Sequence, residues 1–130
     1  MTAYLDNSAT TPVCSEAVEA MKTAVTELWG NPSSLHQKGI EADEMLENAR
    51  SNVARRLFCR DDEVYFTSGG TESNNTAIFG ALRARRGGGR IIVGATEHPS
   101  VYEAAMSMKG QYVINEARVD KTGAYDVNML

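Results

Sequence analysis

Apolar side chains recur at helical spacing in four stretches of the chain. The first two stretches run from Pro12 to Trp29 and from Ile40 to Leu57. The third extends from Ala77 to about Arg85, and a shorter one runs from Val101 to Met108. A spacing of three and four residues places such side chains on one face of a helix. We therefore predict four amphipathic helices, and we expect the apolar stripe of the first helix to be part of the core.

Short runs of β-branched and aromatic residues alternate with these helices. Val64–Phe66, Arg90–Ala95 and Tyr112–Ile114 each predict a strand, and the second of these is expected to be buried. Tyr4–Pro12 has no helical period and predicts an extended arm, whereas Val119–Asp126 predicts a turn. Strands that alternate with helices indicate an α/β fold, in which helices pack on a mostly parallel sheet.

Composition narrows the classes of function. With 130 residues, 42% hydrophobic and 23% charged, the chain is expected to form one domain or part of one. Its net charge of -4 argues against a nucleic-acid or anionic-membrane partner. The longest apolar run, residues 91–95, is too short to span a bilayer, and with no signal peptide recognised we expect a cytoplasmic protein. Cys14 and Cys59 lie far apart, and neither a disulfide framework nor a metal site is predicted.

Two glycines, Gly69 and Gly70, separate the strand predicted at Val64–Phe66 from the following helix. Glycines permit a close approach or a positive φ. The first amides of a helix have no intrahelical acceptor and lie at the positive end of its dipole, so this turn suits an anion of phosphate size. Further donors are the hydroxyls of Ser68, Thr71 and Ser73. A plain connecting turn is the alternative. Neither G-x-x-x-x-G-K-[ST] nor G-x-G-x-x-G occurs, which argues against a nucleotide.

Four segments of the chain carry distinctive motifs, namely Tyr4–Pro12, Gly30–His36, Phe66–Asn75 and Glu97–Val101. In order and spacing they resemble the signatures of the cysteine desulfurases, which are pyridoxal-phosphate enzymes of fold type I in the class V aminotransferase family. The similarity covers essentially the whole chain but only the N-terminal portion of a complete family member. It implies that residues 1–130 are the N-terminal part of the cofactor-binding large domain. Residues 1–15 would then be an extended arm that joins the small domain.

The resemblance assigns roles to three residues. Gly70 and Thr71 would match the pair that holds the phosphate of pyridoxal 5'-phosphate, and His98 would match the catalytic histidine that stacks on the pyridine ring and moves protons. His98 follows a predicted strand at the carboxyl edge of an α/β sheet, where ligands of such folds gather, and an imidazole can relay a proton near neutral pH. The alternative is a histidine that caps the helix beginning at Pro99.

Three further residues are candidates for the substrate pocket. Asn7 and Thr10 are similar to arm residues of the family that approach the substrate, and His36 resembles a position near the mouth of the active site. A loop histidine with a structural hydrogen bond is an equal alternative for His36.

The resemblance implies an enzyme that removes sulfur from L-cysteine, leaving alanine and an enzyme persulfide. A sulfur-acceptor protein would carry the sulfur into iron–sulfur cluster assembly or thiolation. One alternative is a related fold type I lyase or aminotransferase, such as a selenocysteine lyase. Another is a non-catalytic fragment that acts as a scaffold.

The family's cofactor-binding lysine and persulfide-forming cysteine lie in the part of the family beyond Leu130, and neither Cys14 nor Cys59 matches the latter. In the family, the strand matching Val64–Phe66 is not a neighbour of the strand matching Arg90–Ala95. The sheet of this chain alone would therefore have a gap. We expect a complementing polypeptide to supply the rest of the fold, or the strands to re-pair in a homodimer or larger oligomer. The isolated chain is expected not to turn over cysteine.

Overall fold

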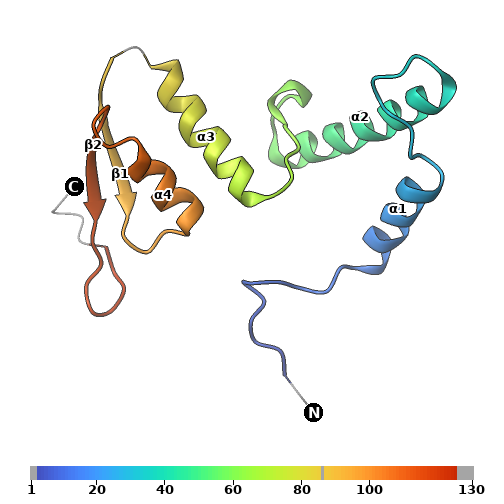
Figure 1. Cartoon of the computed structure of the whole chain (residues 1–130). Coiled ribbons are helices and arrows are strands. Elements are labelled where there is room, and N and C mark those ends of the chain that lie inside the picture. Colours follow the sequence, from blue (N-terminus) through green and yellow to red (C-terminus); the bar gives the residue numbers. More distant parts are fainter. Residues whose placement is uncertain (1–2, 86, 126–130) are drawn as a thin grey trace. The chain divides into compact units, whose positions relative to one another are not determined.

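Four α-helices and a short parallel sheet make up residues 3–85 and 87–125, the part of the chain that this computed structural model describes (Figure 1). The chain forms two compact units, divided between Tyr65 and Phe66. The first unit holds α1 (Ser15–Thr26), α2 (Gln37–Leu57) and the short 3-10 helix η1 (Asp61–Glu63). The second holds α3 (Gly70–Ala84), β1 (Arg90–Gly94), α4 (Pro99–Ser107) and β2 (Val113–Ala117). All four predicted helices are therefore present.

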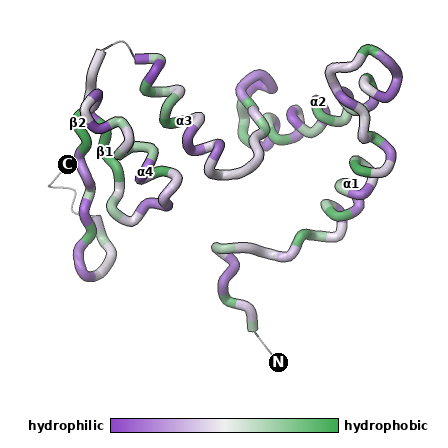
Figure 2. The backbone as a smooth tube through the Cα atoms, viewed as in Figure 1, coloured by the Kyte–Doolittle hydropathy of each residue, from purple (hydrophilic) through white to green (hydrophobic). Residues whose placement is uncertain are grey.

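The core prediction for α1 is wrong. The helix is amphipathic, as the alternating colours along it show in Figure 2, yet none of its residues is buried. Val18, Met21 and Val25 of the apolar stripe are all exposed. The period of a sequence shows that a helix has an apolar face but not which element covers it. Within the described residues of the first unit, no element buries this face.

The loop that precedes α2 fits closely against the first turn of that helix. The Asn31 side chain accepts a hydrogen bond from the Ser33 amide (2.9 Å), and the Ser34 amide donates to the Asn31 carbonyl oxygen (2.9 Å). Gly39 of α2 is buried beneath this loop. A Cβ atom on Gly39 would overlap the Ser34 carbonyl oxygen and lie 2.8 Å from that of Asn31. Glycine is therefore required at this position for space.

Helix α2 ends at Phe58, whose φ of 55° lies in the left-handed region. That region costs a residue with a Cβ atom about 1–2 kcal/mol, and the ring is 97% exposed, so packing recovers little of this cost. We expect Phe58→Gly to raise the free energy of unfolding by about 1 kcal/mol in denaturant titrations. Phe58→Ala is the matched control, because it removes the ring and keeps the strained backbone. Equal stability of the two variants would contradict the strain.

The strand predicted at Val64–Phe66 is not a strand in the structure. Val64 has extended backbone (φ -104°, ψ 122°), but the sheet found among the described residues consists of β1 and β2 and does not include this run. The guanidinium of Arg50 instead donates a hydrogen bond to the Val64 carbonyl oxygen. β-Branched and aromatic side chains favour extended backbone, whereas a strand also needs a neighbour, which the local sequence does not specify.

The sheet of the second unit consists of β1 and β2, which pair in parallel from Arg90↔Val113 to Gly94↔Ala117. Helix α4 makes the crossover between them and packs on β1, and α3 packs on α4 (Figure 1). The buried apolar side chains of this unit are Val93, Ala104, Ala105 and Ala117. This arrangement confirms the predicted α/β class with helices on a parallel sheet.

Burial of the first strand is only partly as expected. Val93 is buried, but Ile92 points to the opposite face of the sheet and is 51% exposed. The strand ends at Gly94 rather than Ala95, although the Ala95 amide still donates to the Ala117 carbonyl oxygen (2.9 Å). Within the described residues, one face of this two-stranded sheet therefore remains uncovered at Ile92.

The turn predicted at Val119–Asp126 forms a hairpin, and Asp126 lies outside the described residues. Val119 and Tyr125 form an antiparallel bridge, and the Asp120 amide donates to the Ala124 carbonyl oxygen (2.9 Å). One carboxylate oxygen of Asp120 accepts from the Thr122 amide (2.7 Å), the Thr122 hydroxyl (2.6 Å) and the Ala124 amide (3.1 Å). This one side chain orders the hairpin tip.

These bonds predict a pH dependence for the hairpin. The Thr122 hydroxyl and then the Thr122 and Ala124 amides lower the pKa of Asp120 from its ordinary value of 3.8. Ionised Asp120 therefore stabilises the hairpin above that value, and the contribution is lost as the pH falls through the lower, folded-state pKa. We expect Asp120→Asn to lose less thermal stability than the natural chain between about pH 6 and about pH 3. Equal losses would contradict this role of the charge.

Candidate cofactor site

Helix α3 begins at the second of the two glycines, Gly70, and Gly69 is its N-cap. Its first backbone hydrogen bond runs from the Ser73 amide to the Gly69 carbonyl oxygen (3.1 Å). The amides of Gly70 and Thr71 precede this bond, so they lie in the part of a helix where amides have no intrahelical acceptor. They are available to an anion at the positive end of the helix dipole.

The space beside this turn is open. A Cβ atom built on Gly69 or on Gly70 would meet no atom within 4 Å. Gly69 has a φ of 166°, which is ordinary extended backbone, and Gly70 is helical, so neither glycine is needed for a positive φ. Of the two possibilities that glycines permit, a positive φ is therefore not used here. The other, room for a close approach, is compatible with this geometry.

Two of the three predicted hydroxyl donors already have partners. The Ser68 hydroxyl and the Ser68 amide both donate to a carboxylate oxygen of Glu72 (2.6 and 2.7 Å). These two bonds lower the pKa of Glu72, so a negative charge stands beside the turn at neutral pH. The Ser73 hydroxyl lies 2.6 Å from that of Thr67. Of the three hydroxyls, that of Thr71 is therefore the one that remains available to a ligand within the described part of the chain.

His98 is the N-cap of α4, and Pro99 is the first residue of that helix. Its Nδ1 atom accepts a hydrogen bond from the Ser100 amide (3.1 Å) and lies 2.8 Å from the Ser100 hydroxyl oxygen. The capping alternative is therefore realised. Because an amide can only donate, Nδ1 must be an acceptor, and we assign the proton of the neutral ring to Nε2. Capping occupies Nδ1 and leaves the Nε2 N–H group as a hydrogen-bond donor.

A hydrogen-bond network joins the start of α3 to His98. The Asn74 side chain donates to the Ser100 hydroxyl oxygen (2.8 Å), which contacts His98 Nδ1. The Asn75 side chain donates to the carbonyl oxygens of Thr71 (2.8 Å) and Ser100 (3.5 Å). The structure thus brings the predicted phosphate turn and His98 into one cluster of the second unit.

Three residues of this network, Asn74, Asn75 and Ser100, were not predicted as site residues. All three lie within the two motifs quoted for the family resemblance, Phe66–Asn75 and Glu97–Val101. A serine in the first turn of a helix is a signal for local capping. Only the packing of α3 against α4 shows that it also receives a bond from an asparagine 26 positions earlier.

The substrate-pocket candidates belong to the first unit. His36 caps α2, and its Nδ1 atom accepts a hydrogen bond from the Gly39 amide (3.3 Å), which is the structural alternative for this residue. Asn7 and Thr10 are exposed and lie in a turn in which the Thr10 amide donates to the Asp6 carbonyl oxygen (3.4 Å). The predicted arm is therefore irregular and contains this turn. The roles of the three residues stay predictions.

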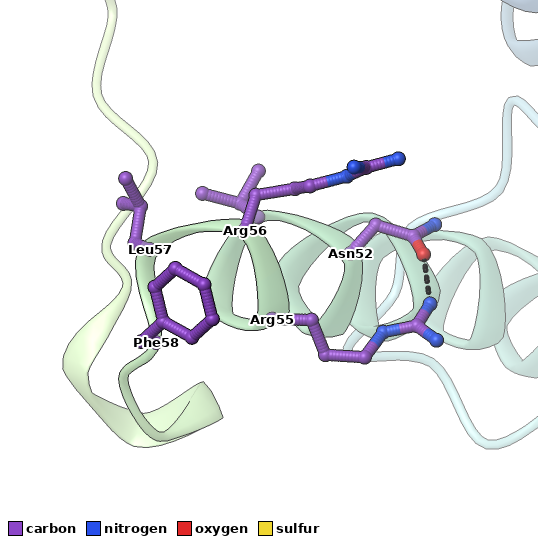
Figure 3. A pocket seen from close by; sticks show the side chains of 6 residues that line it. Asn52, Arg55, Arg56, Leu57 and Phe58 are labelled. Atoms are coloured by element: carbon purple, nitrogen blue, oxygen red, sulfur yellow. Dashed lines mark hydrogen bonds between the residues drawn. The ribbon is translucent and has the colours of Figure 1, made fainter.

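A hollow at the end of α2 contains none of the predicted site residues. Figure 3 shows its lining, in which the Arg55 guanidinium donates to the Asn52 side chain and the Phe58 ring lies at the end of the helix. Among the described residues there is no cluster of histidine, cysteine, aspartate and glutamate that could hold a metal. No helix in that part of the chain is both long enough and apolar enough to cross a membrane. Cys14 and Cys59 are free thiols.

Comparison with known proteins bears on these predictions. Residues 3–130 match the family model "Aminotransferase class-V". The chain is 44% identical over 122 residues to a cysteine desulfurase, IscS, of Methanosarcina thermophila. The aligned region covers 92% of this chain and 30% of that protein. The chain therefore spans about a third of the length of the relatives that it matches.

Two solved structures are similar. A NifS-like protein superposes with a TM-score of 0.82 and 35% identity, covering 99% of this chain and 36% of the other. A structure described as SspA in complex with cysteine gives a TM-score of 0.77 and 30% identity, covering 88% and 34% of the two chains. These similarities confirm the predicted resemblance to cysteine desulfurases and the fold type. The chain belongs to the aminotransferase class-V family.

Proposed function

We propose that the chain is part of a pyridoxal-phosphate-dependent cysteine desulfurase, which removes sulfur from L-cysteine to give alanine and an enzyme persulfide. One observation carries the proposal. The open, amide-rich start of α3 is joined by hydrogen bonds to His98, in a chain that is 44% identical to a cysteine desulfurase. The complex of cysteine with the structurally similar SspA supports the choice of substrate.

The residues present fit pyridoxal 5'-phosphate. The amides of Gly70 and Thr71 and the Thr71 hydroxyl would hold the phosphate, because they are donors at a helix start with open space beside them. The charge of Glu72 opposes an anion at this turn, but its carboxylate is bonded to Ser68 rather than to these amides. When bound, the cofactor supplies an electron sink for bond breaking at the substrate.

His98 would orient the ring of the cofactor and move a proton. Its Nδ1 atom is held by Ser100, so the plane of the imidazole is fixed by a backbone amide. The Nε2 atom carries the proton of the neutral ring, so this nitrogen would be the donor toward a bound group. Stacking requires only a face of the imidazole and is compatible with capping through its edge.

We also propose how the rest of the chain contributes to this enzyme. Residues 1–130 form part of the cofactor-binding large domain, with residues 1–15 as the arm, and Asn7, Thr10 and His36 border the substrate pocket. One partner is a sulfur-acceptor protein. The other is either a second copy of the chain, in a homodimer, or a polypeptide that carries the remaining part of the relatives' fold. The work of the protein is iron–sulfur cluster assembly or thiolation in the cytoplasm.

The test is turnover of L-cysteine by the gene product as the cell makes it. We expect alanine and sulfide in equal amounts when a thiol reductant is present. His98→Gln should abolish turnover, whereas Lys109→Gln, on an exposed position beyond α4, should leave it unchanged. Absence of alanine from cysteine would overturn the proposal, and a preference for selenocysteine would favour the related lyase.

A further inference from the structure

The side chain of Tyr125 reaches the end of β1. Its hydroxyl oxygen lies 2.8 Å from the Thr96 hydroxyl oxygen. A Cβ atom on Gly94 would overlap the Tyr125 hydroxyl and lie 3.1 Å from the Cζ atom of the ring. Gly94 has no positive φ, so its role here concerns space and not conformation. A side chain at residue 94 would have to displace the Tyr125 hydroxyl from its present position.

Tyr125 lies at the end of a hydrogen-bonded hairpin. The hairpin from Val119 is closed by the bridge to Tyr125 and by the bonds that Asp120 makes across its tip. Tyr125 is 43% exposed, and the bond of its hydroxyl to Thr96 joins this hairpin to the end of β1.

The contact lies on the segment that carries His98. The turn after β1 closes with a bond from the Glu97 amide to the Gly94 carbonyl oxygen (3.3 Å). Thr96, two residues before His98, is bonded to Tyr125, and Ser100, two residues after it, is bonded to Asn74 of α3. His98 is thus held from both sides along the chain, by two contacts that come from different elements.

We propose that Tyr125 is a positioning residue for His98, because its hydroxyl holds Thr96 and its ring fills the space that Gly94 leaves. The inference rests on the proposed function, in which a fixed imidazole faces the cofactor. Tyr125 does not itself touch the reacting atoms. Its hydrogen bond restricts the Thr96–His98 turn, and this keeps Nδ1 aligned with the Ser100 amide.

The test observes the imidazole directly. In the gene product labelled with ¹⁵N-histidine, without cofactor, Tyr125→Phe should shift or broaden the ring nitrogen signals of His98, assigned by their loss in His98→Gln. Those of His36 in the other unit should not change, and Thr96→Val, which removes the other partner of the same bond, should reproduce the effect. A Tyr125 that only packs the hairpin would leave the His98 signals unchanged, and that result would overturn the inference.

A second set of variants separates positioning from folding. Gly94→Ala should lower the melting temperature, because the new methyl group overlaps the Tyr125 hydroxyl. Gly94→Ala/Tyr125→Leu should recover the melting temperature but not the natural His98 signals. Recovery of both would overturn the positioning role. The signals are recorded without cofactor, so this test does not depend on the proposed function. If the natural protein did not turn over cysteine but Tyr125→Phe still altered the His98 signals, the proposed function would be overturned and the coupling of Tyr125 to His98 would stand.

Discussion

Thr71→Val is expected to weaken the binding of pyridoxal phosphate by about 1–3 kcal/mol, roughly 5–150-fold in the dissociation constant. Valine has nearly the shape of threonine and keeps the amide of residue 71, so the substitution removes only the hydroxyl. A charged phosphate then lacks one donor at the start of α3. Titration of the gene product with the cofactor, followed by fluorescence, measures the change.

Thr76→Val is the matched control for this experiment. Thr76 is exposed on the same helix and lies beyond its first turn. The same chemical change there should leave cofactor affinity as it is, because the residue is remote from the unbonded amides. Equal affinity of the Thr71 variant and the natural protein would remove Thr71 from the phosphate site.

Gly39→Ala is expected to destabilise the first unit by about 3 kcal/mol, at the upper end for overpacking. The added methyl group would overlap the carbonyl oxygen of Ser34, which is part of the backbone and cannot move away as a flexible side chain would. The clash opposes the higher helix propensity of alanine, which alone favours the variant by up to about 1 kcal/mol. Denaturant titration of the gene product measures the loss.

Gly80→Ala provides the opposite control within α3. Gly80 is also a glycine inside a helix, but a Cβ atom built on it meets nothing within 4 Å. Alanine should therefore stabilise this helix by about 0.5–1 kcal/mol. If both variants were equally stable or equally unstable, the close fit of the Gly30–Ser34 loop against α2 would be refuted.

The sequence predicts local structure well where the signal is itself local. The helices α2 and α3 follow from the apolar period, and the start of α4 follows from the His98-Pro99 pair, because proline suits the first position of a helix. The strand expected at Val64–Phe66 fails for the converse reason. Pairing depends on a neighbour far along the chain, and residue propensity contains no information about that neighbour.

In the candidate site, too, the local features were predictable from the sequence and the long-range contacts were not. The donors at Gly70 and Thr71 were predictable, because a helix start after glycines exposes amides wherever it occurs. The link from Asn74 through Ser100 to His98 was not, because it requires two helices to lie at hydrogen-bonding distance. The close approach of Tyr125 to Gly94 was not predictable either, because nothing in the local sequence indicates that the tyrosine returns to the end of β1.

The parallel pairing of β1 and β2 across a single short helix has a consequence for folding kinetics. Each ladder pair of β1 and β2 joins residues on opposite sides of the whole crossover, so the pairing has to close a loop that contains α4. Contacts within α4 are local, whereas parallel pairing needs contacts of higher sequence separation, which form more slowly. We therefore expect α4 to form before β1 and β2 pair, and the turn that bears His98 to become fixed only when the sheet closes.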